Sequence, residues 1–200
     1  MPLGIRLRLW LPVWLAFFAV CATGNAELPA WHVTDLQGKQ IQTLATPGTH
    51  IVVLVFAATD CPISNRYIPE IARLEETWKA KEVAFWWVYP NPADTLSIVH
   101  KHSQDYSVSA PALIDTNQDL VRMSHATVTP EAAVFSVDKG ELREVYHGRI
   151  DNRYVAFGAE RPQATRHDLE NAIEAALAHK PMPAPDAGPV GCSIVPVAAK

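Results

Sequence analysis

A buried strand that leads directly into a helix at a cysteine is the feature that most restricts the fold of this chain. Residues 50–58 (HIVVLVFAA) form an apolar, β-branched run that is typical of a central strand. Residues 62–81 indicate a helix, with Pro62 in the first turn, where proline is tolerated, and Pro69 further in, where a kink is expected. Cys61 stands between the two elements, so the sequence predicts a sulfur at the N-terminus of a helix.

The position of Cys61 favours an ionised sulfur. Unpaired backbone N–H groups and the positive end of the helix dipole both stabilise a thiolate, so we expect a pKa below the free value of about 8.5. A thiolate is the nucleophile in disulfide exchange and in peroxide reduction. Ser64, one turn later, can donate a hydrogen bond to the sulfur but cannot attack a mixed disulfide. The alternative is an inert buried thiol, which this strand–helix context disfavours.

Strands and helices alternate along the rest of the chain. The expected elements are, in chain order, a hairpin over residues 31–44, a strand over 83–89, a helix over 94–106 capped by Asp94, a strand over 111–116, a helix over 119–125, a hairpin over 131–148 and a helix over 165–180 capped by Thr165. This order indicates an α/β protein with a central mixed sheet flanked by helices. A central strand that delivers a cysteine to a helix narrows the prediction to a thioredoxin-like fold with an N-terminal hairpin.

The first 26 residues have the pattern of a secretory signal peptide. Two arginines precede an apolar run over residues 9–22, and small residues lead up to Ala26, after which we expect cleavage. The apolar run is shorter than the roughly 20 residues that a membrane-spanning helix needs. The sequence therefore predicts an exported protein, periplasmic or extracellular, that meets a membrane only if the signal segment stays uncleaved.

Cleavage changes both the charge and the cysteine content. Loss of two arginines takes the formal net charge from −4 to −6, and the remaining lysines and arginines form no basic stripe, which excludes nucleic acid as a partner. Two cysteines remain, Cys61 and Cys192, in a compartment where a pair can form a disulfide. Two cysteines are too few for a disulfide scaffold in a domain of this size. Nothing in the composition calls for a cofactor or a resident metal.

A proline-rich tail follows a single domain. We assign residues 27–180 to the domain and residues 181–200 to the tail, which carries Cys192. An extended, proline-rich chain covers about 3.1 Å per residue, so Cys192 can reach roughly 35 Å from the end of the domain. This reach exceeds the radius of gyration of about 16 Å expected for the domain, so Cys192 can return to Cys61. Cys192 is then a resolving cysteine, a permanent structural staple or a link to another chain.

Four further residues are expected near the sulfur. Thr129-Pro130 precedes a strand, and in a thioredoxin-like fold such a loop approaches the active cysteine with a cis proline, although alone it is an ordinary strand start. Glu131 would be either a proton acceptor beside the sulfur or a solvated edge residue. Arg149 would stabilise a thiolate or peroxide oxygen; the alternative is a weak surface pair of Asp151 with Arg149 or with Arg153.

Five separated motifs occur in an order that resembles one family. They are FAATDCPISNRYIPEI, TPEAAVFSVD, YHGRIDNRY, ATRHDLENAIEAALAHKP and the closing PVGCSI. Together they resemble exported redoxin-domain proteins of the alkyl hydroperoxide reductase/thiol-specific antioxidant branch of the thioredoxin-like superfamily, over about residues 27–195. The resemblance implies a thioredoxin fold, an antioxidant or thiol oxidoreductase activity, Cys61 as the redox cysteine and Pro130 as the cis proline.

The chain departs from this family's relatives at two motifs. Ser64 replaces the second cysteine of Cys-x-x-Cys, which thioredoxins carry. Leu54 and Ala58 occupy the proline and threonine positions of the Pro-x-x-x-Thr-x-x-Cys motif, whose side chains shape the peroxide pocket of typical peroxiredoxins. These two departures weigh against efficient peroxidase activity.

The leading hypothesis is an exported thiol-dependent oxidoreductase. Cys61 attacks a disulfide of a protein partner or a small peroxide, and Cys192 or an external thiol reductant resolves the product. One alternative is a Cu(I)-binding metallochaperone that uses the cysteines with a histidine, of which His125 and His147 lie nearest in sequence. The other alternative is a non-catalytic module in which Cys61–Cys192 is a structural disulfide.

Overall fold

The computed structural model describes residues 31–182 and 185–197. The expected signal peptide, residues 1–26, lies outside the described residues. Within the described ranges, no helix is both long and apolar enough to cross a membrane.

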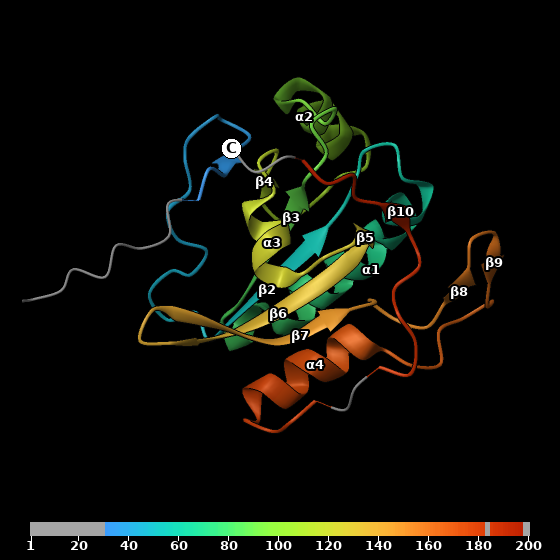
Figure 1. Ribbon diagram of the computed structural model, residues 1–200. Coiled ribbons are helices and arrows are strands. Elements are labelled where there is room, and N and C mark those ends of the chain that lie inside the picture. Colours follow the sequence, from blue (N-terminus) through green and yellow to red (C-terminus); the bar gives the residue numbers. More distant parts are fainter. Residues whose placement is uncertain (1–30, 183–184, 198–200) are drawn as a thin grey trace, which may run out of the picture.

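A six-stranded mixed sheet forms the centre of the molecule, in the order β1-β4-β3-β2-β6-β7 (Figure 1). Its strands are β1 (Thr34–Asp35), β2 (Ile51–Phe56), β3 (Val83–Tyr89), β4 (Ala112–Ile114), β6 (Glu131–Asp138) and β7 (Glu141–Gly148). The neighbours β2, β3 and β4 run parallel, whereas β1, β6 and β7 pair antiparallel with their neighbours. The predicted α/β class with a mixed sheet is confirmed.

The strand β2 lies at the middle of the sheet and is buried on both faces. Every side chain from Ile51 to Phe56 is at most 2% exposed, which accounts for its unbroken apolar sequence. Alternate side chains enter opposite layers: Val53 belongs to one core cluster and Leu54 to the other. Because neither face of β2 is exposed to solvent, this strand is a rigid support for the segment that follows it and leads to Cys61.

Four α-helices cover the sheet. They are α1 (Pro62–Trp78), α2 (Leu96–Asp105), α3 (Asp119–Ser124) and α4 (Asp168–Leu177), and a 3-10 turn, η1 (Lys79–Lys81), extends α1. Side chains of α1 and α4, such as Ile71 and Ile173, share one core cluster with Val53. Leu120 of α3 lies in the other cluster, with Leu44 and Leu54. The predicted helices are therefore present, and α1 continues through Pro69.

Three local predictions are wrong in detail. The N-terminal hairpin is reduced to a turn closed by one bridge between Thr34 and Gln40 and by a hydrogen bond from Ile41 N–H to the Val33 oxygen at 2.9 Å, and residues 41–44 form no strand. Asp94 does not cap α2, which begins after Thr95, because the Asp94 carboxylate accepts a hydrogen bond from Thr59 instead. Thr165 does not cap α4, because its hydroxyl accepts a hydrogen bond from Asn152.

The tail returns to the domain as a docked strand. Residues 192–193 form β10, which pairs antiparallel with β5 (Val128–Thr129), the two-residue strand before β6. Figure 1 shows the red tail running from α4 past the end of the sheet to β10. A small separate hairpin, β8 (Tyr154–Ala156) with β9 (Ala159–Glu160), projects at the side. Composition alone predicted an extended arm, and the structure shows where that arm binds.

Candidate active site at Cys61

Cys61 caps the N-terminus of α1 and is fully buried. Its backbone is extended, with φ −83° and ψ 111°, and its carbonyl oxygen accepts the first helical hydrogen bond from Asn65 N–H at 3.1 Å. Its own N–H donates to the Ala58 oxygen at 3.1 Å, and Ala57 N–H donates to Val88 of β3 at 2.8 Å. The sheet and the helix therefore fix the backbone on both sides of the sulfur.

Two groups from distant parts of the chain meet the Cys61 sulfur. The thiol of Cys192 lies 2.8 Å away, Sγ to Sγ, and donates a hydrogen bond to it. The Cys61 thiol in turn donates to the Thr129 carbonyl oxygen at 3.0 Å. The Thr129–Pro130 peptide bond is cis, and both cysteines are free thiols. The structure thus brings together Cys61, Cys192, Thr129 and Pro130, four of the predicted site residues.

The two thiols differ in acidity. Burial raises the pKa of Cys61, but hydrogen bonds from the Cys192 thiol and from Ser64 outweigh it, so the net pKa lies below that of an ordinary thiol. Burial and the hydrogen bond to Cys61 raise the pKa of Cys192 to about 12. Cys61 is therefore the sulfur that ionises, and Cys192 is the sulfur that keeps its proton.

Ser64 is buried beside the sulfur on the first turn of α1. Its hydroxyl has no hydrogen-bond partner among the described residues while Cys61 is a thiol. The hydroxyl and the backbone N–H of Ser64 both lower the pKa of Cys61, since each can donate to the ionised sulfur. The predicted role of Ser64 as a donor to the thiolate is consistent with this position.

Glu131 is neither of the two things expected of it. Its side chain is buried, so it is not a solvated edge residue. Its carboxylate accepts hydrogen bonds from the N–H groups of Thr127 and Val128, at 2.8 and 3.2 Å, and has no hydrogen bond to either sulfur. Glu131 instead holds the loop that presents the Thr129 oxygen to Cys61. The sequence carries no signal for this role, because it depends on the turn that precedes β6.

Arg149 also differs from both predictions. Its guanidinium is buried and does not hydrogen-bond to either sulfur, so we do not retain it as a thiolate or peroxide ligand. Its Nε lies 2.6 Å from Asp168 of α4, and its Nη2 lies 2.5 Å from Asp186 of the tail. The predicted surface pair with Asp151 is wrong too, because the Asp151 carboxylate accepts from the Tyr67 hydroxyl at 2.5 Å. Arg149 ties the tail to the domain.

A chain of buried and half-buried polar groups supports the turn before Cys61, and no sequence pattern indicates it. The Thr59 hydroxyl donates to Asp94, and the Thr59 carbonyl oxygen accepts from Asn65 Nδ2 at 3.3 Å. The Asn65 amide oxygen then accepts from His102 Nε2 at 2.8 Å, and His102 Nδ1 lies 3.2 Å from the Tyr89 hydroxyl. Burial raises the pKa of Asp94 and lowers that of His102. Burial therefore opposes the charged form of each group.

The tail covers the sulfur as a short strand. Cys192 stands opposite Thr129 in the register of β10 and β5, and Ile194 N–H donates to the Thr127 oxygen at 2.9 Å. Gly191 passes so close to the domain that only a residue without a β-carbon fits there. Ile194 is buried in the core cluster that contains Leu54. The tail is therefore seated by packing and by backbone hydrogen bonds as well as by its sulfur.

The histidines do not join the cysteines. The rings of His125 and His147 lie 6.2 Å apart, centroid to centroid, and line a cavity of about 360 Å³ with residues 185–189. No hydrogen bond among the described residues connects either ring to a sulfur. The mixed cysteine–histidine set that a Cu(I) site would need is not assembled around Cys61.

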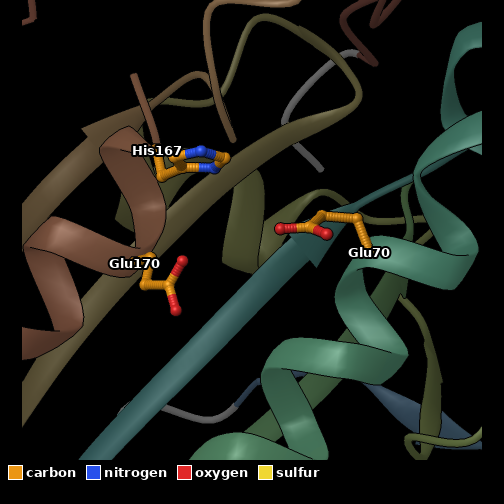
Figure 2. A group of neighbouring side chains, drawn as sticks. All are labelled: Glu70, His167 and Glu170. Carbon is orange, nitrogen blue, oxygen red and sulfur yellow. The ribbon is translucent and has the colours of Figure 1, made fainter. Parts of the chain in front are cut away.

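A different cluster of side chains, between α1 and α4, has the spacing of metal ligands. Figure 2 shows Glu70 on α1 facing His167 and Glu170 at the start of α4. Within the described residues this is the one group of three potential ligands, and it contains no cysteine. Arg73 lies 2.8 Å from Glu70 and 2.9 Å from Glu170, so a guanidinium already neutralises both carboxylates. The cluster is accounted for as an ion-pair network between the two helices.

The sheet order, the cysteine at the α1 N-terminus and the cis proline facing it define a thioredoxin-like protein. The sequence profile of the AhpC/TSA family matches residues 25–145, which is more than half of the chain. The chain belongs to the AhpC/TSA family. No functionally curated protein matches it.

Solved structures with the same fold cover most of the chain. An uncharacterised conserved protein from Geobacillus kaustophilus is 22% identical, with a TM-score of 0.67 over 86% of this chain and 92% of that chain. A hypothetical protein from Sinorhizobium meliloti 1021 is also 22% identical, with a TM-score of 0.64 over 81% and 88%. A putative thioredoxin from Neisseria meningitidis is 21% identical, with a TM-score of 0.51 over 72% and 85%. These similarities support the fold.

Proposed function

We propose that this protein is an exported thiol-dependent oxidoreductase in which Cys61 is the nucleophile and Cys192 is the resolving cysteine. The observation that carries the proposal is a pair of free sulfurs 2.8 Å apart whose pKa values are shifted in opposite directions. A disulfide bond needs a separation of about 2.05 Å, so the two sulfurs need to approach by less than 1 Å to join. Membership of the AhpC/TSA family supports a redox role in general terms.

The reaction with a disulfide R–S–S–R follows from this asymmetry. The Cys61 thiolate attacks one sulfur, forms a Cys61–S–R bond and releases R–S⁻. Cys192 loses its proton to the released thiolate and attacks Cys61 Sγ, which expels the second R–S⁻ and closes the Cys61–Cys192 disulfide. Two electrons have then passed to the partner. Two external thiols then reduce the Cys61–Cys192 disulfide, become joined in a disulfide themselves, and restore both protein thiols.

A small peroxide R–O–O–H reacts at the same sulfur. The Cys61 thiolate attacks one peroxide oxygen and is oxidised to a sulfenic acid, while R–O⁻ leaves and takes up a proton. The Cys192 thiol then condenses with the sulfenic acid, and water leaves as the disulfide forms. Because Leu54 and Ala58 replace the residues that shape a typical peroxide pocket, we place disulfides ahead of peroxides as partners.

A resolving role for Cys192 is favoured over a purely structural one. The tail is already held in the thiol form by the Arg149–Asp186 ion pair, by burial of Ile194 and by the β10–β5 pairing. A disulfide is therefore not required to hold the tail in place. A structural staple would also have no use for a Cys61 sulfur whose pKa is lowered. The predicted signal peptide, residues 1–26, supports export to a compartment where such a pair can be oxidised.

The test compares the reduced wild type with Cys61→Ser and Cys192→Ser. Each protein is mixed with a small aromatic disulfide or with hydrogen peroxide, and its thiols and adducts are followed by mass spectrometry. We expect the wild type to end as an internal disulfide, Cys192→Ser to accumulate an adduct or sulfenic acid on Cys61, and Cys61→Ser to react on the order of a hundredfold more slowly. Equal reactivity of Cys61→Ser and the wild type would refute the proposal.

A further inference from the structure

Gln118 binds the tail on the C-terminal side of Cys192. It precedes α3, its backbone is left-handed with φ 60° and ψ 35°, and its side chain is 4% exposed. Its Nε2 donates to the Val195 oxygen at 2.8 Å, and its Oε1 accepts from Val197 N–H at 3.0 Å. One amide group therefore satisfies both a donor and an acceptor of the tail backbone, as a neighbouring strand would.

The tail has a second anchor on the N-terminal side of Cys192. Asp186 forms ion pairs with Arg149, at 2.5 Å, and with Arg166, at 2.8 Å. Cys192 thus lies between an ionic anchor six residues before it and an amide anchor that begins three residues after it. Its sulfur stays in line with Cys61 only while the chain is held on both sides.

The strand between the anchors is too short to hold itself. β10 contains two residues, whereas a typical strand contains about five or six. Each ordered residue loses backbone entropy, and the few hydrogen bonds of a two-residue pairing oppose that loss weakly. The additional bonds from Gln118 therefore act together with the buried Ile194 side chain to keep this segment ordered.

We propose that Gln118 is a positioning residue for the resolving step, because its amide holds residues 195–197 so that Cys192 stays seated on Cys61. The inference rests on the proposed function of the two cysteines. Gln118 raises the effective concentration of the Cys192 thiol at Cys61, and this concentration decides how readily the internal disulfide forms. Gln118 touches neither sulfur and acts through the tail.

The experiment measures the equilibrium between full-length protein and reduced and oxidised glutathione. In this exchange one glutathione disulfide is reduced to two glutathione thiols as Cys61 and Cys192 join. The variants are Gln118→Ala, which removes both hydrogen bonds to the tail and a longer one from Nε2 to the Pro90 oxygen at 3.4 Å, and Gln118→Glu, which keeps only the acceptor. Val197→Pro removes the N–H of the tail without altering the domain. Gln40→Ala is the matched control, because it removes a side-chain amide hydrogen bond to the Trp31 oxygen, away from the tail.

We expect Gln118→Ala to lower the equilibrium constant for the internal disulfide on the order of tenfold, since both of its hydrogen bonds to the tail are lost. Gln118→Glu and Val197→Pro should lie between it and the wild type, and Gln40→Ala should match the wild type. A constant that stays within about twofold of the wild type in both Gln118→Ala and Val197→Pro would overturn the proposal, even if the melting temperature of either falls.

A failure of the Gln118 inference can be distinguished from a failure of the proposed function. The glutathione equilibrium reports only how closely the two thiols are paired, so the Gln118 inference can fail while Cys61 remains the nucleophile. Conversely, if Cys61→Ser consumes a small disulfide as fast as the wild type, the proposed function fails whatever the Gln118 variants do.

Discussion

Gly191 lies so close to Thr129 that a β-carbon on Gly191 would stand 2.2 Å from the Thr129 carbonyl oxygen. The same oxygen accepts the hydrogen bond of the Cys61 thiol, and the residue after Gly191 is Cys192. The backbone of the tail is therefore in contact with the backbone of the loop that faces the reactive sulfur. No side-chain movement can relieve a clash at this point, because the obstructing atoms belong to the main chain.

Replacement of Gly191 should accordingly undock the tail. We expect Gly191→Val to increase the rate at which a maleimide labels Cys192 about tenfold or more, since overpacking of this kind costs about 1–3 kcal/mol. Gly188→Val is the matched control in the same tail, because nothing lies within 4 Å of the β-carbon it would introduce. Equal labelling of Cys192 in both variants would show that β10 is not seated against Thr129.

The acidity of Cys61 should depend on Cys192. Loss of the thiol donor in Cys192→Ala removes a hydrogen bond that favours the Cys61 thiolate, so the pKa of Cys61 should rise. A higher pKa means less thiolate near neutral pH, and alkylation of Cys61 by iodoacetamide at pH 7 should slow on the order of tenfold.

The measurement is the full pH profile of that alkylation rate. Its midpoint should move to higher pH in Cys192→Ala and by a smaller amount in Ser64→Ala, while the plateau rate at high pH stays similar. A midpoint that moves to lower pH in Cys192→Ala would mean that the tail restrains the thiolate rather than stabilising it.

Arg149 should matter for stability more than an exposed arginine does. Arg149→Ala leaves the carboxylate of Asp168, which is fully buried, with only the more distant Arg166 at 3.2 Å. Breaking a buried ion pair costs about 3–5 kcal/mol, and we expect about 3 kcal/mol in urea unfolding because Arg166 remains. Arg66→Ala is the control, since its pair with Glu160 is solvent-exposed and should change the unfolding midpoint little.

The polar chain behind the Cys61 turn should be sensitive at Asn65. Asn65→Ala removes the acceptor of His102 and the donor to the Thr59 oxygen, which leaves a buried imidazole N–H unpaired. An unsatisfied buried group costs about 1–3 kcal/mol, so unfolding by urea should occur at a lower concentration. Asn171→Ala, at an exposed position of α4, should stay within about 0.5 kcal/mol of the wild type. Equal losses in both variants would refute a special role for the Asn65 bonds.

Local patterns were sufficient for the parts of the site that lie close together in sequence. The β-branched run at 50–58, followed by Cys61 and Pro62, specifies a strand, a turn and a helix within about 15 residues. Hydrophobic periodicity is a good predictor of such local elements. The order of the remaining strands and helices was then enough to predict a mixed sheet. Because the order of elements indicated a thioredoxin-like fold, Thr129-Pro130 could be assigned to the loop opposite the cysteine.

The long-range partners could not be predicted. Arg149 binds Asp168 and Asp186, 19 and 37 residues away, and other acidic residues were equally plausible partners from the sequence. Gln118 binds the tail 77 and 79 residues further along, through one amide that no motif marks. Chain reach showed that Cys192 can come back to Cys61. The register that brings it there depends on the space beside Gly191, which only the folded loop defines.

The contact between Cys61 and Cys192 joins positions 131 residues apart. Oxidation would therefore convert most of the molecule into a closed ring that contains β3, β4, β6 and β7, while β2 is clamped between two of these strands from outside the ring. A ring of that size restricts the unfolded chain, and the chain-entropy estimate for such a closure is roughly 5 kcal/mol. The oxidised and reduced proteins would share one architecture but differ in how long they survive heat and proteases. The lifetime of the protein would then follow the redox balance of its surroundings.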